Sequence, residues 1–220
     1  MTEIPPLDDA AVLWSVPPDE RAGRPLLVLL HGYGSHEGDL FGLVPYLPER
    51  FVAAAVRAPL APPFPTPGWS WFPIEGVYAR DPAAATAAAE RFLAWLDGIV
   101  AATDAASIGL LGFSQGAVIA LQAMRLQPER FAFAVNLAGY ADAGALPTDA
   151  ELARVRPPVF WGRGARDEVI PADRVEHTIE WLPAHVELSG RVYPGLTHSV
   201  SQEELDDVRA FLDRQLAAGS

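Results

Sequence analysis

A serine lies at the centre of a G-x-S-x-G pentapeptide, Gly112-Phe113-Ser114-Gln115-Gly116. The apolar run 108–111 precedes it and the apolar run 117–121 follows it, a pattern that predicts a buried strand turning sharply into a helix. At such a turn the glycines allow a strained backbone that exposes the serine oxygen, and the helix N-terminus points its N–H groups at that oxygen. The pentapeptide alone would also fit an unreactive turn. Its context predicts a nucleophilic serine.

A nucleophilic serine needs a base, and His198 lies where one is expected. It occupies the loop 194–199, between the β-rich run 186–193 and an amphipathic C-terminal helix. A doubly wound hydrolase places its base in this position. The remaining histidines fit a loop, a cap or a solvated face better: His31, His36, His177 and His185.

The orienting acid should lie between nucleophile and base, at the end of a strand. Asp167 follows the apolar run 158–162 through a short turn. Glu168 is adjacent and chemically equivalent, but the helix started by Pro171 would leave Asp167 nearer the strand end. Weaker alternatives lie in an Ala/Gly/Pro-rich loop: Asp142 and Asp149.

The three candidates occur in the order nucleophile, acid, base, which is the order of α/β-hydrolases rather than of chymotrypsin or subtilisin. An oxyanion hole needs two further backbone N–H groups. Gln115, directly after the serine, is positioned to supply one. The strand predicted at 26–30 ends in His31-Gly32-Tyr33-Gly34, whose glycines let the backbone approach a substrate, so the Tyr33 N–H is the second candidate.

Four motifs in this order cover nearly the whole chain: Leu30-His31-Gly32-Tyr33-Gly34, the pentapeptide around Ser114, Gly164-Ala165-Arg166-Asp167 and Gly195-Leu196-Thr197-His198-Ser199. Together they resemble the phospholipase/carboxylesterase family, which includes the acyl-protein thioesterases, and within it the bacterial predicted-esterase branch. The resemblance implies a single-domain α/β-hydrolase with Ser114, Asp167 and His198 as triad. It also implies esterase or thioesterase activity without a cofactor.

Two positions depart from the family pattern. Ala117 stands where the family often has a second glycine, and Pro73 follows Trp71-Phe72 where the acyl-protein thioesterase branch commonly has Asp. These departures bear on whether the substrate is a long-chain acyl protein, and they leave the triad intact.

Strands alternate with helices along the chain, which predicts an α/β fold with a mainly parallel, doubly wound sheet. With 220 residues, 50% of them hydrophobic, we expect one α/β-hydrolase domain over 1–220 without a separate cap domain. The strands are predicted at 12–16, 26–30, 52–56, 107–111, 133–137, 158–161 and 186–193.

Two helices have clear start signals. One begins at Asp81-Pro82, a side-chain cap followed by a proline, and its predicted buried stripe is Phe92, Leu93, Leu96, Ile99 and Val100. The last helix begins with a capping box from Ser201 to Glu204, which limits how far the His198 loop can move.

The segment 59–73 holds six prolines and four aromatic residues, so it cannot form a regular helix or a central strand. We expect an irregular loop that forms a stiff apolar wall over the serine, with Trp69, Trp71 and Phe72 binding substrate together with Leu196 near the base. The alternative is a loop that only packs on the surface. The pocket would then lie around Tyr33, Phe41 and Leu196.

The chain has a formal net charge of −12, and its sixteen basic residues are all arginine. Nucleic acids and anionic membranes are therefore poor partners, and Schiff-base chemistry is excluded. The absence of cysteine excludes a thiol nucleophile and a disulfide. Without H-E-x-x-H or C-x-x-C motifs we expect no metal site, and without a visible signal peptide or membrane span we expect a cytoplasmic protein. A homodimer is left open.

These features predict a serine esterase acting on small or medium acyl esters or thioesters. An acyltransferase or peptidase on the same fold would share the acyl-enzyme and differ only in the group that intercepts it. A binding protein that retains the fold is the third alternative, since fold does not fix function.

Overall fold

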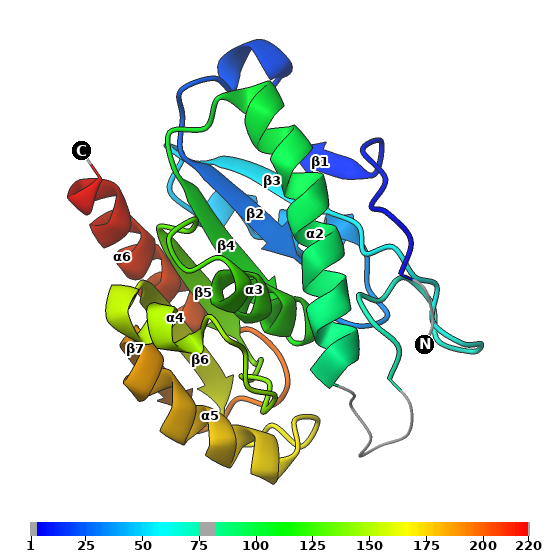
Figure 1. The fold of residues 1–220 in the computed structure, drawn as a ribbon, viewed down its shortest axis with the longest axis vertical. Coiled ribbons are helices and arrows are strands. Elements are labelled where there is room, and N and C mark those ends of the chain that lie inside the picture. Colours follow the sequence, from blue (N-terminus) through cyan, green and yellow to red (C-terminus); the bar gives the residue numbers. More distant parts are fainter. Residues whose placement is uncertain (1–3, 75–81, 220) are drawn as a thin grey trace.

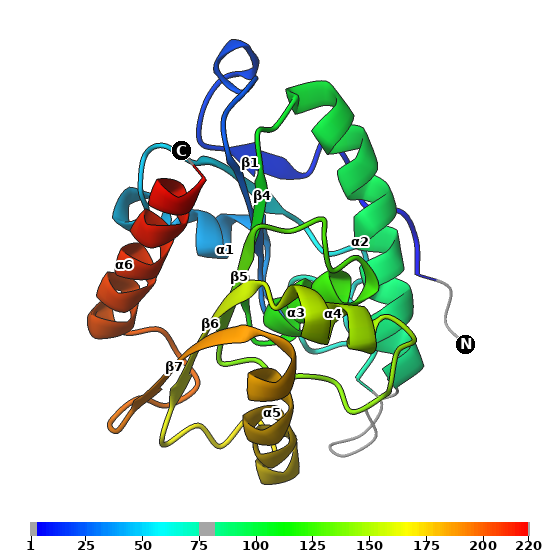
Figure 2. The ribbon, with the colours of Figure 1, turned by 60° about the vertical axis from the view of Figure 1, so that its left-hand side comes forward.

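The computed structural model describes residues 4–74 and 82–219, and these form one seven-stranded sheet between two layers of helices (Figures 1 and 2). The strand order is β1-β3-β2-β4-β5-β6-β7. Neighbouring strands are parallel except for β1, which pairs antiparallel with β3. The strands are β1 (Val12–Trp14), β2 (Leu26–Leu30), β3 (Val52–Val56), β4 (Ile108–Phe113), β5 (Phe133–Leu137), β6 (Pro158–Gly164) and β7 (Glu187–Tyr193).

Helices cover both faces of the sheet. The α-helices are α1 (Glu37–Phe41), α2 (Pro82–Thr103), α3 (Gln115–Leu126), α4 (Asp149–Val155), α5 (Ala172–His185) and α6 (Gln202–Ala218), and two short 3₁₀ helices are η1 (Pro18–Glu20) and η2 (Val44–Tyr46). Helices α1 and α6 lie on one face, and α2, α3 and α5 lie on the other with α4 beside them (Figure 2).

The alternation of side chains along the strands builds a hydrophobic core on each face. Along β2, Leu26, Val28 and Leu30 pack in the cluster that includes α2 and α3. Leu27 and Leu29 pack in the cluster that includes α1 and α6. All five β2 residues are buried, as expected of a central parallel strand covered on both sides.

The chain reverses its direction of winding between β2 and β4, which are direct neighbours with Leu30 paired to Gly112. From β2 the chain continues to β3 on one side, and from β4 it continues to β5 on the other. In open α/β sheets, ligands bind in the crevice at the carboxyl ends of the strands at such a switch point. The loop after β2 and the turn after β4 both lie there.

The structure confirms the predicted α/β fold and its mostly parallel sheet, with differences at the strand ends. Strands β2, β3 and β5 have the predicted bounds. Strand β1 ends at Trp14, two residues early, and Pro17 follows closely. Strands β4 and β6 run on to Phe113 and Gly164 because the parallel ladders continue to these residues.

The two predicted helix starts have different outcomes. Ser201 caps α6 by accepting a hydrogen bond from the Glu204 N–H, whereas Asp81 lies outside the described residues. In α2 the predicted stripe faces the core, with Phe92 and Leu96 fully buried. None of the helices in residues 4–74 and 82–219 is both long and apolar enough to cross a bilayer.

Candidate active site

Ser114 occupies the sharp turn between β4 and α3, with φ of 52° and ψ of −117°. A positive φ is strained for a residue with a β-carbon, so the surroundings must hold it. The Ser114 N–H donates to the Leu137 carbonyl at 2.9 Å, and the Ser114 carbonyl accepts from the Ala117 N–H at 3.0 Å. These bonds tie the turn to β5 and to the first turn of α3.

The two glycines of the pentapeptide are required by close packing. A β-carbon at Gly112 would lie 2.5 Å from the Ala117 nitrogen, and one at Gly116 would lie 2.0 Å from the Leu30 carbonyl oxygen. Any larger residue at either position would push α3 away from β4 or β2. The start of α3 can lie close beneath Ser114 only because both flanking positions of the G-x-S-x-G pattern are glycine.

The three predicted triad side chains meet at the carboxyl end of the sheet. His198 Nε2 lies 2.9 Å from Ser114 Oγ, and His198 Nδ1 lies 2.7 Å from Asp167 Oδ2. The Asp167 side chain is 5% exposed and that of His198 is 16% exposed. Residues separated by 84 and 31 positions thus form one hydrogen-bonded chain.

Asp167 rather than Glu168 faces the histidine. The second Asp167 oxygen, Oδ1, accepts from the N–H groups of Val169 at 2.9 Å and Ile170 at 3.2 Å, which fixes the carboxylate in a turn. Glu168 is exposed. The weaker alternatives are engaged with arginines elsewhere: Asp149 with Arg125 at 2.8 Å and Asp142 with Arg174 at 3.7 Å.

The Phe113 ring packs beside the His198 imidazole, with ring centroids 5.0 Å apart and planes inclined by 48°. Phe113 is the last residue of β4, directly before Ser114. The same strand end therefore supplies both the serine and an apolar surface that restricts the rotation of the histidine.

One predicted oxyanion donor, Gln115, directly follows Ser114, and the loop that carries the other, Tyr33, passes beside the serine at Gly32. Gln115 is the first residue of α3, where backbone N–H groups have no intrahelical partner. Tyr33 follows Gly32, and a β-carbon at Gly32 would lie 3.5 Å from the Ser114 β-carbon. The loop after β2 therefore runs directly past the serine.

His31 shapes this loop and was not assigned a role by the sequence. It is 1% exposed; its Nε2 accepts from the Ala58 N–H at 3.0 Å and its Nδ1 lies 2.8 Å from the Gly32 carbonyl oxygen. Burial lowers the pKa of His31, which favours the neutral ring. With Nε2 accepting, Nδ1 carries the proton and donates to Gly32.

The other three histidines lie outside the triad. His36 caps α1 by accepting from the Gly38 N–H at 3.1 Å. His185 stacks on Trp181 at the end of α5. His177 lies within α5.

The side chains of Trp71 and Phe72, predicted to form an apolar wall over the serine, lie in the core instead. Trp71 is 0% exposed and Phe72 is 2% exposed, and the Trp71 indole packs edge-on against Phe92 of α2, with centroids 6.2 Å apart. The indole Nε1 donates to the His31 carbonyl at 2.8 Å. In the core the apolar ring is removed from water and the indole N–H has a hydrogen-bond acceptor. Trp71 therefore supports the backbone at His31 from within the core.

The Gln115 side chain clamps the same segment. Its Oε1 accepts from the Trp71 N–H and its Nε2 donates to the Phe72 carbonyl, each at 2.8 Å. Sequence reasoning considered only the backbone of Gln115 and missed this clamp. The available signal was a residue with both a donor and an acceptor placed at a buried helix start.

Trp69 connects the loop 59–73 to the loop after β2, which carries Tyr33. The Trp69 N–H donates to the Ser35 carbonyl at 2.8 Å, and the Gly34 N–H donates to the Trp69 carbonyl at 2.9 Å. The half-buried indole also lies beneath the Arg57 guanidinium, at 5.1 Å. This part of the loop holds the backbone around Tyr33 in place.

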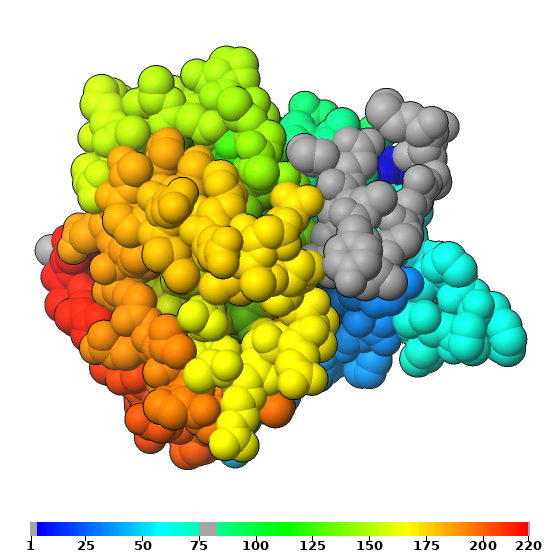
Figure 3. All heavy atoms as spheres, turned by 90° about the horizontal axis from the view of Figure 1, so that it is seen from below, coloured from blue at the N-terminus to red at the C-terminus, as the bar shows by residue number. Residues whose placement is uncertain are grey.

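A cavity of about 310 Å³ opens beside Tyr33. The loop 59–73 contributes Leu60, Ser70 and several prolines to its wall, and Ile74 completes it. The tip of this loop projects from the body of the molecule (Figure 3, cyan), and Phe64 within it is 97% exposed. The inner side of the loop thus lines the cavity beside Tyr33.

Leu196 lies in the His198 loop and is half-buried. Its carbonyl accepts from the Arg166 N–H at 2.9 Å, so the backbone of Leu196 ties the histidine loop to the segment that carries Asp167. This contact gives Leu196 a part in holding the site; its predicted contact with substrate stays a prediction.

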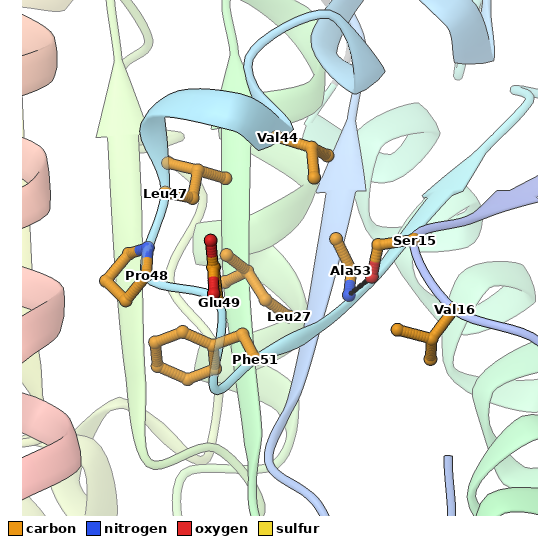
Figure 4. Close-up of a pocket in the computed structure, with 9 residues that line it drawn as sticks. All are labelled: Ser15, Val16, Leu27, Val44, Leu47, Pro48, Glu49, Phe51 and Ala53. Atoms are coloured by element: carbon orange, nitrogen blue, oxygen red, sulfur yellow. Dashed lines mark hydrogen bonds between the residues drawn. The ribbon is translucent and has the colours of Figure 1, made fainter. Parts of the chain in front are cut away.

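A second cavity, of about 300 Å³, lies at the opposite ends of β2 and β3 (Figure 4). The buried side chains of Leu27, Leu47 and Phe51 line it. The Ser15 hydroxyl in its wall accepts a hydrogen bond from the Ala53 N–H at 2.8 Å.

Within the described residues no group of three or more His, Cys, Asp or Glu side chains could hold a metal ion.

The family model for Phospholipase/Carboxylesterase matches residues 14–216. The chain belongs to this family. A probable carboxylesterase of Oryza sativa subsp. japonica is 30% identical over 213 residues, which cover 87% of this chain and 88% of the relative. Acyl-protein thioesterase 1 of Saccharomyces cerevisiae is 30% identical over 111 residues, 49% of each chain. The chain thus spans about half the length of the curated thioesterases it matches.

Solved structures give the same fold. Esterase PE8 superposes with a TM-score of 0.77 at 28% identity, covering 93% of this chain and 98% of the other. The carboxylesterase from Mesorhizobium loti superposes with a TM-score of 0.78 at 22% identity, covering 96% and 99%.

Proposed function

We propose that this protein is a serine carboxylesterase that hydrolyses small to medium acyl esters or thioesters through an acyl-enzyme. The observation that carries the proposal is the contact chain from Ser114 Oγ to His198 Nε2 at 2.9 Å and from His198 Nδ1 to Asp167 Oδ2 at 2.7 Å. Membership in the phospholipase/carboxylesterase family supports it.

The proposed reaction gives each of these three side chains a role. Ser114 Oγ attacks the acyl carbonyl carbon while His198 Nε2 takes the hydroxyl proton. Asp167 holds the imidazole with Nδ1–H towards itself and stabilises the imidazolium. The proton then passes to the departing alcohol or thiol, which leaves the acyl group on Ser114.

The second half of the reaction repeats these roles with water. His198 takes a proton from water, the hydroxide attacks the acyl carbon, and the proton returns to Ser114 Oγ as the acid leaves. In both halves the N–H groups of Gln115 and Tyr33 would stabilise the negative oxygen of the tetrahedral intermediate. The N-terminus of α3, which begins at Gln115, favours negative charge at this position.

The cavity beside Tyr33 is the best candidate for the acyl group. Its volume of about 310 Å³ is at the lower end of small-molecule sites, which span roughly 300 to 1,000 Å³. This size favours small and medium acyl chains. Pro73, one of the two departures from the family pattern, lies in its wall.

The proposal is tested with p-nitrophenyl esters and acyl thioesters from acetyl to decanoyl. We expect hydrolysis with an optimum at short or medium chains, and Ser114→Ala should lower kcat by about 10⁴ to 10⁶-fold. Ser107→Ala is the matched control, because Ser107 lies just before β4 at the opposite end of the strand. A folded Ser114→Ala protein with near-normal turnover would contradict the proposal.

Product analysis separates hydrolysis from transfer. With an added alcohol or amine acceptor, an esterase releases the free acid, whereas an acyltransferase forms the new ester or amide. If most of the acyl group is transferred to the acceptor at low acceptor concentration, the protein is an acyltransferase rather than a hydrolase. The acyl-enzyme step would be the same in both cases. A cytoplasmic location, the absence of nucleic-acid and membrane partners, and a homodimer stay predictions.

A further inference from the structure

A buried acid lies close in sequence to the His198 loop and has no role in the proposed reaction. Glu204, in the first turn of α6, is 1% exposed, and it follows His198 by six residues. Among the described residues neither carboxyl oxygen has a hydrogen-bond partner. The pKa of Glu204 is raised to about 7, and burial is the largest cause of this shift. Such an unsatisfied group costs stability and needs an explanation.

The carboxyl fills a slot that a glycine leaves in β6. A β-carbon at Gly162 would lie 2.1 Å from Glu204 Oε1 and 3.1 Å from Glu204 Cδ. Two residues along the strand, a β-carbon at Gly164 would lie 2.1 Å from the Leu196 carbonyl oxygen. Because residues two apart face the same side of a strand, β6 receives α6 and the His198 loop at adjacent positions.

The same strand end leads to the acid of the triad. Asp167 follows Gly164 by three residues, and the connecting segment is bonded to the histidine side of the site. The Ala165 N–H donates to the Tyr193 carbonyl and the Arg166 N–H donates to the Leu196 carbonyl, each at 2.9 Å. The distance between α6 and β6 therefore affects His198 and Asp167 together.

The charged groups around Glu204 do not neutralise it. After burial, the approach of the Ser201 backbone N–H at the start of α6 lowers the pKa of Glu204, and the negative charge of Asp207, one turn further along α6, raises it. From β7, the Tyr193 hydroxyl donates to Asp207 at 2.9 Å and Arg191 approaches Asp207 at 3.6 Å. On β6 the carboxyl faces Gly162. The Arg191 guanidinium thus pairs with Asp207.

We propose that Glu204 is a positioning residue whose carboxyl, seated against Gly162, sets the spacing of α6 and β6 and so holds His198 in line with Ser114 and Asp167. This inference rests on the proposed function. Shape rather than charge is the property required, because the slot is buried and no described residue forms an ion pair with the carboxyl.

Replacement of the side chain tests this role. Glu204→Ala should lower kcat for p-nitrophenyl acetate by about 10 to 100-fold with KM changed less than about threefold, since misplacement by about 1 Å can cost this much. Glu204→Gln keeps the shape and should retain kcat within about threefold. The matched control is Glu203→Ala, which removes the exposed neighbour and should leave both constants unchanged.

Rates are expressed per folded molecule, with the folded fraction measured by near-ultraviolet circular dichroism. If Glu204→Ala loses stability but keeps its kcat per folded molecule, the positioning role is wrong. A different result, a Ser114→Ala variant that stays active, would contradict the proposed function itself. A Glu204→Gln variant as slow as Glu204→Ala would show that ionisation, not shape, matters, and would overturn the inference.

A second route applies if Glu204→Ala does not fold. Gly162→Ala places a β-carbon in the slot and displaces the carboxyl, so kcat should fall. Adding Glu204→Asp shortens the acid by one methylene and should restore part of kcat. A Gly162→Ala variant with unchanged kcat, or a double variant no faster than Gly162→Ala, would contradict the coupling of the two residues.

Discussion

Ser114 has a backbone conformation that serine rarely adopts, and the neighbouring glycines make it accessible. The sequence predicted this turn because the pentapeptide stood between two apolar runs. It favoured Asp167 over Glu168 only by an estimate of where the strand would end; in the structure β6 runs to Gly164 and Asp167 points at His198. The burial of Glu204 could not be predicted, because acids in the first turn of a helix are usually solvated.

Asp167→Asn tests the assignment of the acid. The amide cannot stabilise the imidazolium and can hold the wrong tautomer, so kcat should fall by about 10³ to 10⁴-fold. Glu168→Gln, a change at the exposed neighbour, should leave kcat within about twofold. Steady-state kinetics on one p-nitrophenyl ester measure both. If the Glu168 variant is slow and the Asp167 variant is not, the acid has been misassigned.

Glu204→Gln should change how stability depends on pH. The pKa of Glu204 is raised from 4.5 to about 7 in the folded chain. Between these values the unfolded chain has lost the proton that the folded chain retains, so the wild type loses stability as pH rises through this window. The loss amounts to about 3 kcal/mol.

Glutamine does not ionise, so the stability of the variant relative to the wild type should rise by up to about 3 kcal/mol between pH 4.5 and pH 8. Urea unfolding at both pH values measures this difference. A stability difference that stays constant with pH would show that the pKa of Glu204 is not raised in the folded protein.

The loop 59–73 supports the loop after β2, which carries Tyr33. Trp69 is bonded to the segment around Tyr33, while Trp71 and Phe72 are held by His31 and Gln115. The sequence predicted an ordered, functional loop from its prolines and aromatic rings. It could not predict which rings point inward, because an irregular loop has no periodicity that separates a buried face from an exposed one.

Trp71→Ala should therefore act on stability first. Removing a fully buried indole should cost about 3 to 5 kcal/mol, measured by urea unfolding. Phe64→Ala is the control from the same loop, and because Phe64 is 97% exposed the cost should stay within about 0.5 kcal/mol. A Trp71→Ala protein of normal stability with an altered chain-length profile would restore the interpretation of Trp71 as part of the acyl pocket.

The whole sheet explains why three distant residues meet. Ser114, Asp167 and His198 follow the carboxyl ends of β4, β6 and β7, and the loop that carries Tyr33 follows β2. A parallel sheet brings these ends to one edge. The alternation of apolar runs predicted that arrangement, whereas the order of the strands and the antiparallel pairing of β1 depend on contacts between distant segments that local patterns do not encode.

The central claim is that Ser114 is the nucleophile of a serine hydrolase, and covalent labelling with a fluorophosphonate tests it most directly. The account predicts one phosphonyl group per chain, located on Ser114 by peptide mass spectrometry, with ester hydrolysis lost in proportion to labelling. Ser114→Ala should take up no label, and Ser107→Ala should label like the wild type. A folded protein that hydrolyses esters but is not labelled, or is labelled at another residue, would contradict the account.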